Sequence, residues 1–282
     1  MLLSSAQEPD PWFGIKYTMN LYRGCQHQCI YCDSRSECYG IDEFSDVLVK
    51  ANAIELLERE LPRKRVVGTV GTGAMSDAYG PVERTYRLME RALAIIARQR
   101  YPVHIITKSD LVVRDVDILV DISRVYAAVS FTVTTADDEL GRKVEPGAPL
   151  VSKRYEAMAT LASKGITTGV TMMPILPFIE DTRENITCII TRAHECGARY
   201  IMPALGMTLR KRQREYYYAR LDELFPGLRA RYERAYGDRY EATVERAREL
   251  DALVHELCER YGLALRMPHY VPPPVLQQAT LF

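Results

Sequence analysis

The chain of 282 residues has no excess charge of either sign, no long apolar run and few cysteines. No segment approaches the roughly 20 consecutive apolar residues of a membrane-spanning helix, so we expect no membrane partner. The first residues, MLLSSAQEPDPW, lack the basic start and apolar stretch of a secretion signal, and we therefore expect a cytoplasmic protein. Lysine plus arginine equals aspartate plus glutamate, 37 each, so the net charge does not indicate a nucleic-acid partner.

Two local basic runs depart from this balance, at residues 63–65 and 210–214, and tyrosines follow the second run at 216–218. Basic residues beside aromatic ones suit a phosphate backbone with stacked bases. The alternative is a solvated helix face above tyrosines of the core, and the residues alone favour that interpretation.

Short β-branched runs alternate with helical patterns through residues 15–205. The predicted strands are 15–21, 66–70, 103–107, 126–132, 168–173 and 200–205. Gly165 and Gly197 each follow a helical pattern just before a strand, where glycine commonly ends a helix. This alternation predicts a parallel sheet with helices outside it. Periodicity does not distinguish an open doubly wound sheet from a partial barrel.

The pattern changes after Leu205. Residues 211–262 are rich in charge and tyrosine and predict two or three helices, the last ended by Gly262. A proline run at 272–274 leads into a short tail. The predicted parts are an N-terminal extension (1–14), an α/β body (15–208), a helical extension (209–268) and a proline-rich tail (269–282).

Three of the seven cysteines lie close together, at Cys25, Cys29 and Cys32. In a cytoplasmic protein such a cluster indicates a metal site rather than disulfides. Four thiolates would complete a structural zinc site, but no second pair has a suitable spacing. Three thiolates suit three irons of a 4Fe–4S cluster and leave the fourth iron open. The alternative is a zinc site with His27 or Cys38 as fourth ligand.

The spacing C-x3-C-x2-C, with Tyr31 directly before the last cysteine, resembles the signature of the radical S-adenosylmethionine (SAM) enzymes. The resemblance implies a partial (β/α)6 TIM-like barrel, with the helical residues as a C-terminal extension. It also implies a 4Fe–4S cluster whose open iron binds the amine and carboxylate of SAM. Reductive cleavage of SAM then gives a 5′-deoxyadenosyl radical, which removes a hydrogen atom from the substrate. An electron donor such as flavodoxin or ferredoxin would be needed.

Five segments resemble the spore photoproduct lyase-like branch of this superfamily and cover most of residues 15–205. In chain order they read NLYRGCQHQCIYC, SDAYGPVE, TKSDLVVRD, VSF and EPGAP. This resemblance implies a lyase-like, DNA-repair-like reaction on a nucleic acid. The alternatives are a radical SAM enzyme that acts on a peptide or small metabolite, and a non-enzymatic scaffold that binds zinc or a cluster.

By this resemblance Ser76, Lys108 and Ser130 bind the cofactor, and we add Tyr31 of the cysteine motif and the glycines Gly71 and Gly73 to the predicted cofactor-binding residues. Lys108 would supply a cation to the SAM carboxylate, and the two serines would supply hydrogen bonds. The glycines would let backbone amides approach the cofactor closely. We expect these residues at the carboxyl ends of the strands, where ligands bind in such folds.

Three charged residues, Arg114, Glu145 and Arg154, also fit the family pattern. They would line the same mouth or form a structural set of ion pairs at the rim of the barrel. The sequence does not choose between the two.

The chain departs from the spore photoproduct lyases at Met75. Those enzymes resemble each other in a cysteine just before the Ser-Asp pair, and its thiol returns a hydrogen atom to the product radical. A thioether has no S–H hydrogen, so Met75 cannot do this. Tyr79 and Cys38 carry labile hydrogens and are the candidate catalytic residues here.

The chain ends in QATLF after a proline-rich spacer. This ending resembles the peptide by which bacterial DNA-processing enzymes bind the DNA sliding clamp, with Gln278, Leu281 and Phe282 in the key places. Two apolar anchors and one amide suit a preformed pocket on a partner. A frayed end without a partner is the alternative.

Overall fold

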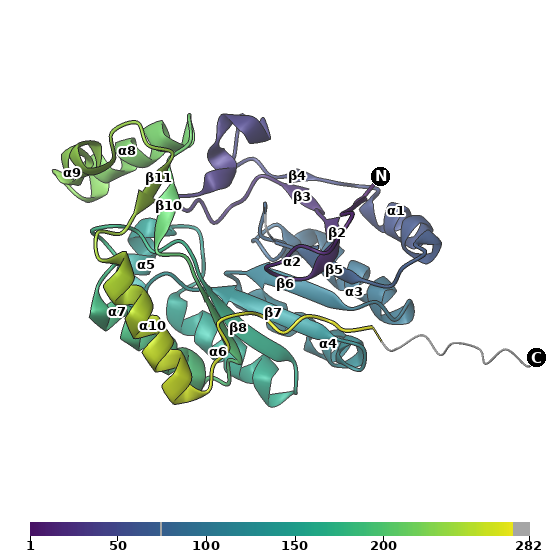
Figure 1. The fold of residues 1–282 in the computed structure, drawn as a ribbon. Helices are drawn as coiled ribbons and strands as arrows, with labels where there is room; N and C mark the ends of the chain where they lie inside the picture. Colours follow the sequence, from purple (N-terminus) through teal and green to yellow (C-terminus); the bar gives the residue numbers. More distant parts are fainter. Residues whose placement is uncertain (74, 273–282) are drawn as a thin grey trace, which may run out of the picture.

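The computed structural model describes residues 1–73 and 75–272, and a seven-stranded sheet lies at its centre (Figure 1). Across the sheet the strands are β1 (Leu3–Ser5), β2 (Ile15–Met19), β5 (Thr69–Thr72), β6 (Val103–Thr107), β7 (Ala127–Thr132), β8 (Thr167–Met172) and β9 (Tyr200–Pro203). Strand β1 is antiparallel to β2, and the other neighbouring pairs are parallel.

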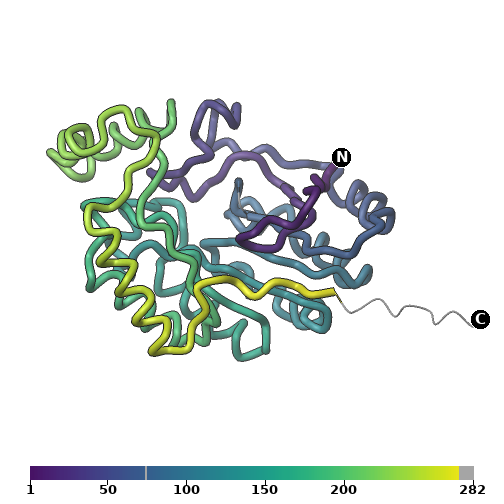
Figure 2. The backbone as a smooth tube through the Cα atoms, viewed as in Figure 1, coloured from purple at the N-terminus to yellow at the C-terminus, as the bar shows by residue number. Residues whose placement is uncertain are grey.

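The order of the parallel strands decides between the two predicted architectures. Strands β2 to β9 follow one another across the sheet in chain order, whereas a doubly wound sheet reverses at a switch point. The sheet curves, with helices outside it (Figure 1), and the backbone tube follows the same path (Figure 2). Among the described residues, the two edge strands β1 and β9 do not pair with each other. The fold is therefore a partial barrel, and the predicted fold class is confirmed.

Helices connect the strands and cover the outer face of the sheet (Figure 1). They are α1 (Ala53–Glu60), α2 (Glu83–Tyr86), α3 (Leu88–Arg98), α4 (Val116–Ser123), α5 (Asp138–Val144), α6 (Val151–Ser163) and α7 (Arg183–Glu195). Gly165 and Gly197 follow α6 and α7 with φ of +80° each, a conformation that favours glycine. Both predicted helix ends are confirmed.

The predicted strand at 66–70 begins too early. The pairing with β2 starts at Thr69, opposite Ile15, and the strand continues to Thr72. Val66 and Val67 precede this pairing and are 57% and 42% exposed. The prediction began too early because these two β-branched residues continue the strand-like sequence pattern into a segment that the sheet does not bury.

The extension after Leu205 contains a two-stranded antiparallel sheet, called the hairpin below although two helices connect its strands, that the sequence pattern did not predict. Strands β10 (Gly206–Thr208) and β11 (Glu241–Thr243) pair antiparallel, with α8 (Gln213–Leu224) and α9 (Leu228–Tyr236) between them. The buried tyrosines of α8 and α9 share a core with Leu176 and Phe178 of the body. The tyrosines at 217 and 218 thus belong to this core, as the alternative interpretation held.

The last helix, α10 (Ala247–Tyr261), packs on α7, and the chain then returns to the barrel. Ala264 pairs with the edge of β9, where Ile201 N donates to its carbonyl at 2.8 Å. The segment therefore covers the free edge of β9. Gln278, Leu281 and Phe282, the predicted clamp-binding residues, lie outside the described residues.

Shorter elements complete the described chain. They are strands β3 (Tyr22–Arg23) and β4 (Leu48–Val49) and the 3-10 turns Asp33–Arg35, Glu37–Tyr39, Leu61–Arg63 and Asp110–Asp115. Within residues 1–73 and 75–272, no helix combines the length and the apolar content needed to cross a bilayer.

Candidate functional site

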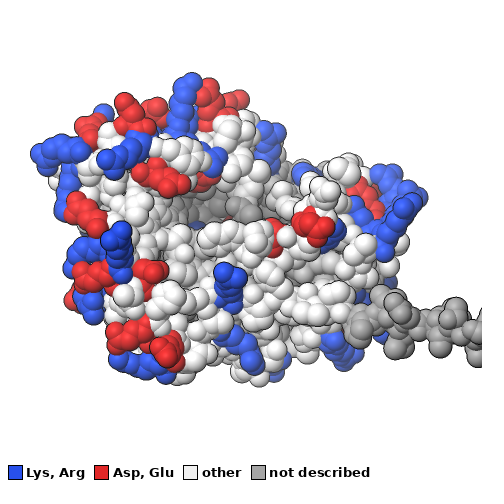
Figure 3. Space-filling model, in the orientation of Figure 1, with Lys and Arg blue, Asp and Glu red and all other residues white. Residues whose placement is uncertain are grey.

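A cavity of about 580 Å³ opens at the carboxyl ends of the parallel strands. Figure 3 shows a hollow surrounded mostly by uncharged residues, with charge gathered over the extension. The lining includes the cysteine loop with Tyr31 and Cys32, the strand ends with Lys108, the hairpin with Met207, and Phe13 near the N-terminus. The cavity thus lies where ligands bind in such barrels.

Backbone hydrogen bonds fix the cysteine loop at both ends. Gly24 has φ of +91°, and a Cβ there would lie 2.8 Å from the Phe44 carbonyl oxygen, so a side chain is excluded. Cys25 N donates to the same carbonyl at 2.9 Å, and Ile30 N donates to Val144 O at 2.9 Å. The loop is therefore anchored on two other segments.

The three thiols form a set of soft ligands, of which Cys29 is buried and Cys25 and Cys32 are partly exposed. Burial raises the pKa of all three, that of Cys25 to about 11. Burial has the largest effect on the pKa of Cys29, and the charges of Lys108, Glu145, Cys32 and Cys25 also act on it. Thiolates at such a site form together with metal binding, which displaces their protons. The donor set therefore fits an iron–sulfur cluster.

The zinc alternative finds little support among the described residues. His27 faces Asp77, with Nε2 3.1 Å from Oδ2, and its Nδ1 lies 3.2 Å from Gly147 O. Cys38 is exposed and contacts the Arg210 guanidinium at 3.4 Å. Within residues 1–73 and 75–272, no three cysteine, histidine or acidic side chains are arranged to hold one ion. A cluster does not require such convergence, because each thiolate binds its own iron.

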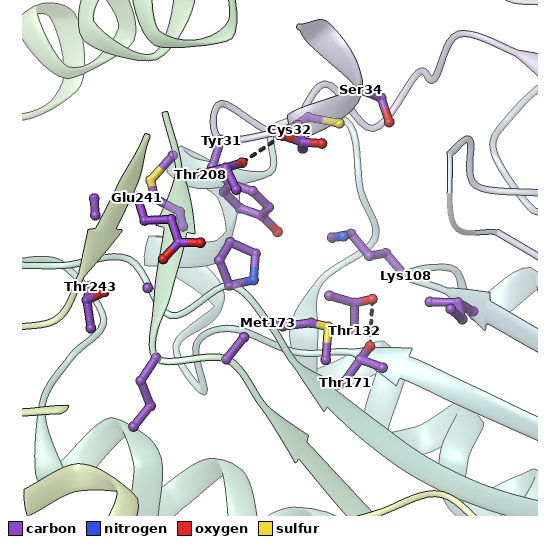
Figure 4. A pocket seen from close by; sticks show the side chains of 18 of the residues that line it. Tyr31, Cys32, Ser34, Lys108, Thr132, Thr171, Met173, Thr208, Glu241 and Thr243 are labelled. Atoms are coloured by element: carbon purple, nitrogen blue, oxygen red, sulfur yellow. Dashed lines mark hydrogen bonds between the residues drawn. The ribbon is translucent and has the colours of Figure 1, made fainter. Parts of the chain in front are cut away.

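A buried charge network lies beside the cysteines. The Tyr31 hydroxyl donates to the Glu145 carboxylate, which also pairs with Arg154 at 2.5 Å. The ammonium of Lys108 lies 3.9 Å from Glu145 and 5.7 Å from the centre of the Tyr31 ring. In Figure 4 the Lys108 ammonium and the Tyr31 hydroxyl point toward each other. Glu145 and Arg154 therefore form a structural pair that supports two cavity-lining residues.

The network stabilises the charged forms of its members. Burial by itself raises the pKa of Glu145, but Arg154, Lys108 and the Tyr31 hydrogen bond outweigh it and hold this pKa below its ordinary value. Burial by itself lowers the pKa of Lys108, but Cys29 and Glu145 outweigh it and raise the pKa. The cationic form of Lys108 is therefore favoured at the cavity wall.

Gly73 lines the cavity, and Ser76 lies nearby in the chain but is not among the described residues that line it. The Ser76 side chain is buried, and its Oγ has no hydrogen-bond partner among the described residues. Such a group ordinarily finds a partner, so a ligand or water is expected there. Gly73 lines the cavity with φ of +99°, and a Cβ would lie 1.9 Å from Ile106 O. Only glycine brings the backbone this close.

Two other predicted cofactor-binding residues lie among packed side chains. Ser130 Oγ lies 2.7 Å from His104 Nε2 and 2.6 Å from the Tyr200 hydroxyl, inside the barrel. Gly71 belongs to β5 and packs against Ile15. Neither is among the described residues that line the cavity. Their role at the cofactor stays a prediction.

The two candidate hydrogen donors also lie away from the cavity lining. Tyr79 is buried in the core, and its hydroxyl donates to Asp115 at 2.9 Å. Cys38 borders a neighbouring hollow together with Arg210.

Arg114 pairs with Asp115 at 2.7 Å and with Glu83 at 2.6 Å, in a cluster separate from Glu145.

Several cavity residues were not predicted. Thr132 ends β7 and Thr171 is the last residue but one of β8, and their hydroxyls lie 3.0 Å apart (Figure 4). Glu241 and Thr208 come from the hairpin and lie across the cavity from Lys108 (Figure 4). The two threonines could have been predicted, because they lie at or near the ends of predicted strands. The hairpin residues could not, because strands of three residues leave no recognisable sequence pattern.

Comparisons with solved structures establish the fold independently. A spore photoproduct lyase complexed with dinucleoside spore photoproduct has a TM-score of 0.69 at 16% identity, over 93% of this chain and 78% of the other. A variant of that enzyme with bound AdoMet and the dinucleoside also has a TM-score of 0.69.

Comparisons of sequence give the family. An uncharacterized protein of Mycobacterium tuberculosis strain H37Rv is 31% identical over 232 residues, which span 79% of this chain and 67% of the relative. An uncharacterized protein of Methanocaldococcus jannaschii is 34% identical over 171 residues, which span 60% of this chain and 63% of the relative. The family model described as the Radical SAM superfamily matches residues 19–187, more than half of the chain. The chain therefore belongs to the radical SAM superfamily.

Proposed function

We propose that this protein is a radical SAM enzyme that holds a 4Fe–4S cluster on Cys25, Cys29 and Cys32 and binds SAM in the adjoining cavity. The observation that carries the proposal is the position of Cys32 and Lys108 on the wall of one cavity. When bound, such a cluster supplies the electron that cleaves SAM to methionine and the 5′-deoxyadenosyl radical.

The chain's own residues have distinct tasks in this proposal. Lys108 provides the cation for the SAM carboxylate, because its ammonium is oriented by Glu145 and Tyr31. Ser76 offers an unused hydroxyl, and Gly73 offers backbone without a side chain. The apolar part of the wall keeps water away from a reactive carbon radical.

Anaerobic reconstitution with iron and sulfide tests the enzyme proposal. We expect the reduced protein to release 5′-deoxyadenosine from SAM, and Cys29→Ala to lose both the cluster and this release. Cys258→Ala is the matched control, since Cys258 is a buried thiol of α10 outside the cysteine loop. Reconstituted wild-type protein that releases no 5′-deoxyadenosine would contradict the proposal and favour the scaffold alternative.

For the substrate we propose a nucleic acid or nucleotide and a lyase-like reaction. The support is the resemblance to spore photoproduct lyase, of which one matching structure holds a dinucleoside spore photoproduct. Met75 distinguishes this chain, because its thioether cannot return a hydrogen atom. We therefore expect the hydrogen donor to differ from that of the lyases.

A peptide or small metabolite is the second candidate, and one observation favours it. Each basic side chain of the 210–214 run has an acidic partner; the pairs are Arg210–Asp33, Lys211–Glu37, Arg212–Asp42 and Arg214–Asp238. Phosphate binding relies on cations that are free to replace counterions. Substrate-dependent 5′-deoxyadenosine release separates the candidates: stimulation by DNA or RNA supports the first, and stimulation by peptides or metabolites alone supports the second.

Further partners and the location are part of the proposal. Reduction of the cluster requires a donor such as flavodoxin or ferredoxin, and the chemistry suits the cytoplasm. We also propose that Gln278, Leu281 and Phe282 bind the DNA sliding clamp. Removing residues 281–282 should abolish clamp binding in a pull-down, and unchanged binding would refute that role.

A further inference from the structure

The residue after the third cysteine connects the cysteine loop to the extension. One Asp33 carboxylate oxygen accepts from the Thr208 hydroxyl at 2.6 Å and lies 3.0 Å from Arg210 Nε. The other oxygen accepts from the Tyr39 hydroxyl at 3.2 Å. Thr208 ends β10, so the hairpin is bonded to the position directly after Cys32.

The residue before the third cysteine is held from the same side. Gln213 is fully buried at the start of α8, and its Nε2 donates to Tyr31 O at 3.1 Å. Its Oε1 accepts from Arg210 N at 2.9 Å. Gln213 therefore connects the backbone on one side of Cys32 to the backbone of the extension.

These contacts surround Cys32 without touching its sulfur. We propose that Asp33 and Gln213 are positioning residues for the Cys32 ligand, so that the extension is part of the cluster site. The inference rests on the proposed function for the identity of the bound group. The fixing of residues 31–33 by the extension is independent of the proposed function.

The chemistry of the two contacts explains why they fix the loop. Removing the Gln213 side chain leaves the buried Tyr31 carbonyl without its partner, and an unpaired buried group is costly. Asp33 is partly exposed, yet it gathers two hydroxyls and a guanidinium on one carboxylate. Residues that orient metal ligands in this way typically change metal affinity by about 10–100-fold when they are replaced.

A surface ion pair between the same two segments provides the matched control. Lys211 Nζ lies 2.8 Å from Glu37 Oε2, with side chains that are 77% and 62% exposed. Exposed pairs of this kind contribute little. Lys211→Ala should therefore leave the loop and its ligand unchanged.

The experiment compares Gln213→Ala, Asp33→Ala and Lys211→Ala with the wild type in two measurements. Hydrogen exchange of the metal-free protein should be faster in residues 25–44 for the first two variants only. After anaerobic reconstitution, release of iron to a chelator should be about 10-fold faster for the same two variants. Wild-type exchange and iron release in both variants would overturn the inference.

Two further results keep the test decisive. Exchange across residues 103–172 should stay unchanged, which shows that the barrel is folded. If Asp33→Ala disturbs the barrel, Thr208→Val removes one hydroxyl from Asp33 and should still raise exchange in the loop. If the wild type takes up no iron, the proposed function fails, and the exchange measurement alone decides whether the extension fixes the loop.

Discussion

The Glu145→Gln substitution removes the charge from a buried ion pair and leaves the size of the side chain almost unchanged. Glu145 is 1% and Arg154 is 1% exposed, and their charged groups lie 2.5 Å apart. Loss of one partner of such a pair costs about 3–5 kcal/mol, because the other charge stays buried. Arg154 also donates to Thr132 O and Pro149 O at 2.9 Å each, so we expect the lower end of this range.

Chemical denaturation of the metal-free protein at pH 7 measures this free energy of unfolding. Glu139→Gln is the matched control: Glu139 belongs to the neighbouring helix α5, and its pair with Arg142 is exposed on both sides. It should cost no more than about 1 kcal/mol. If Glu145→Gln were equally mild, the backbone carbonyls would be sufficient partners for Arg154, and the pair with Glu145 would not stabilise the fold.

The same substitution changes the pH dependence in a defined direction. The folded-state pKa of Glu145 lies below its unfolded value, so its stabilisation is present above about pH 4.3 and is lost as the pH falls through the folded pKa. Wild-type protein should therefore lose stability on acidification more steeply than Glu145→Gln. Parallel pH profiles would refute this assignment.

Three other substitutions test separate parts of the structure. Burial raises the pKa of Glu180 to about 8, so the folded state binds this proton more tightly than the unfolded state, and the resulting stabilisation is lost as the pH rises from about 4.3 to 8. The free energy of unfolding of Glu180→Gln should therefore depend less on pH across that window than that of the wild type. An unchanged pH dependence would contradict the shift. Gly73→Ala should destabilise the fold by more than about 3 kcal/mol, because the new Cβ would meet Ile106 O. Gly165→Ala is the control and should cost about 1–2 kcal/mol, because the space around its Cβ is open. Equal thermal midpoints of the two variants would refute this difference. Tyr79→Phe should lower the free energy of unfolding by about 1–3 kcal/mol, because the hydrogen bond to Asp115 is lost. It should leave 5′-deoxyadenosine release intact. A loss of that release without a loss of stability would instead give Tyr79 a catalytic role.

The parts of the site that the sequence predicted are those with local signals. The cysteine spacing lies within eight positions, and Lys108 directly follows a strand with a clear β-branched run. The helix ends at Gly165 and Gly197 depend on a backbone conformation that one residue type favours. Each of these signals needs only its own stretch of chain.

Contacts between distant segments have no such signal. The Tyr31 hydroxyl and Glu145 are 114 positions apart, and whether Glu145 lines the mouth or forms an ion pair depends on where Arg154 lies. Ser130 shows the same limit in the opposite direction. Its position in a strand was predicted correctly, but its hydroxyl direction is set by His104 and Tyr200 on two other strands.

The hairpin shows why the extension resists prediction from sequence and yet matters for the site. Strands of three residues carry too little alternation to be recognised, and the bond from Thr208 to Asp33 joins positions 175 apart. The charged sequence of the extension predicts helices with a solvated face, and the ion pairs of residues 210–214 agree with that interpretation. However, one buried amide, Gln213, faces inward among them and reaches the backbone beside Cys32. In the full chain, Gln213→Ala should therefore retain all three cysteines but release iron to a chelator faster than the wild type, and equal release rates would contradict this role of the extension.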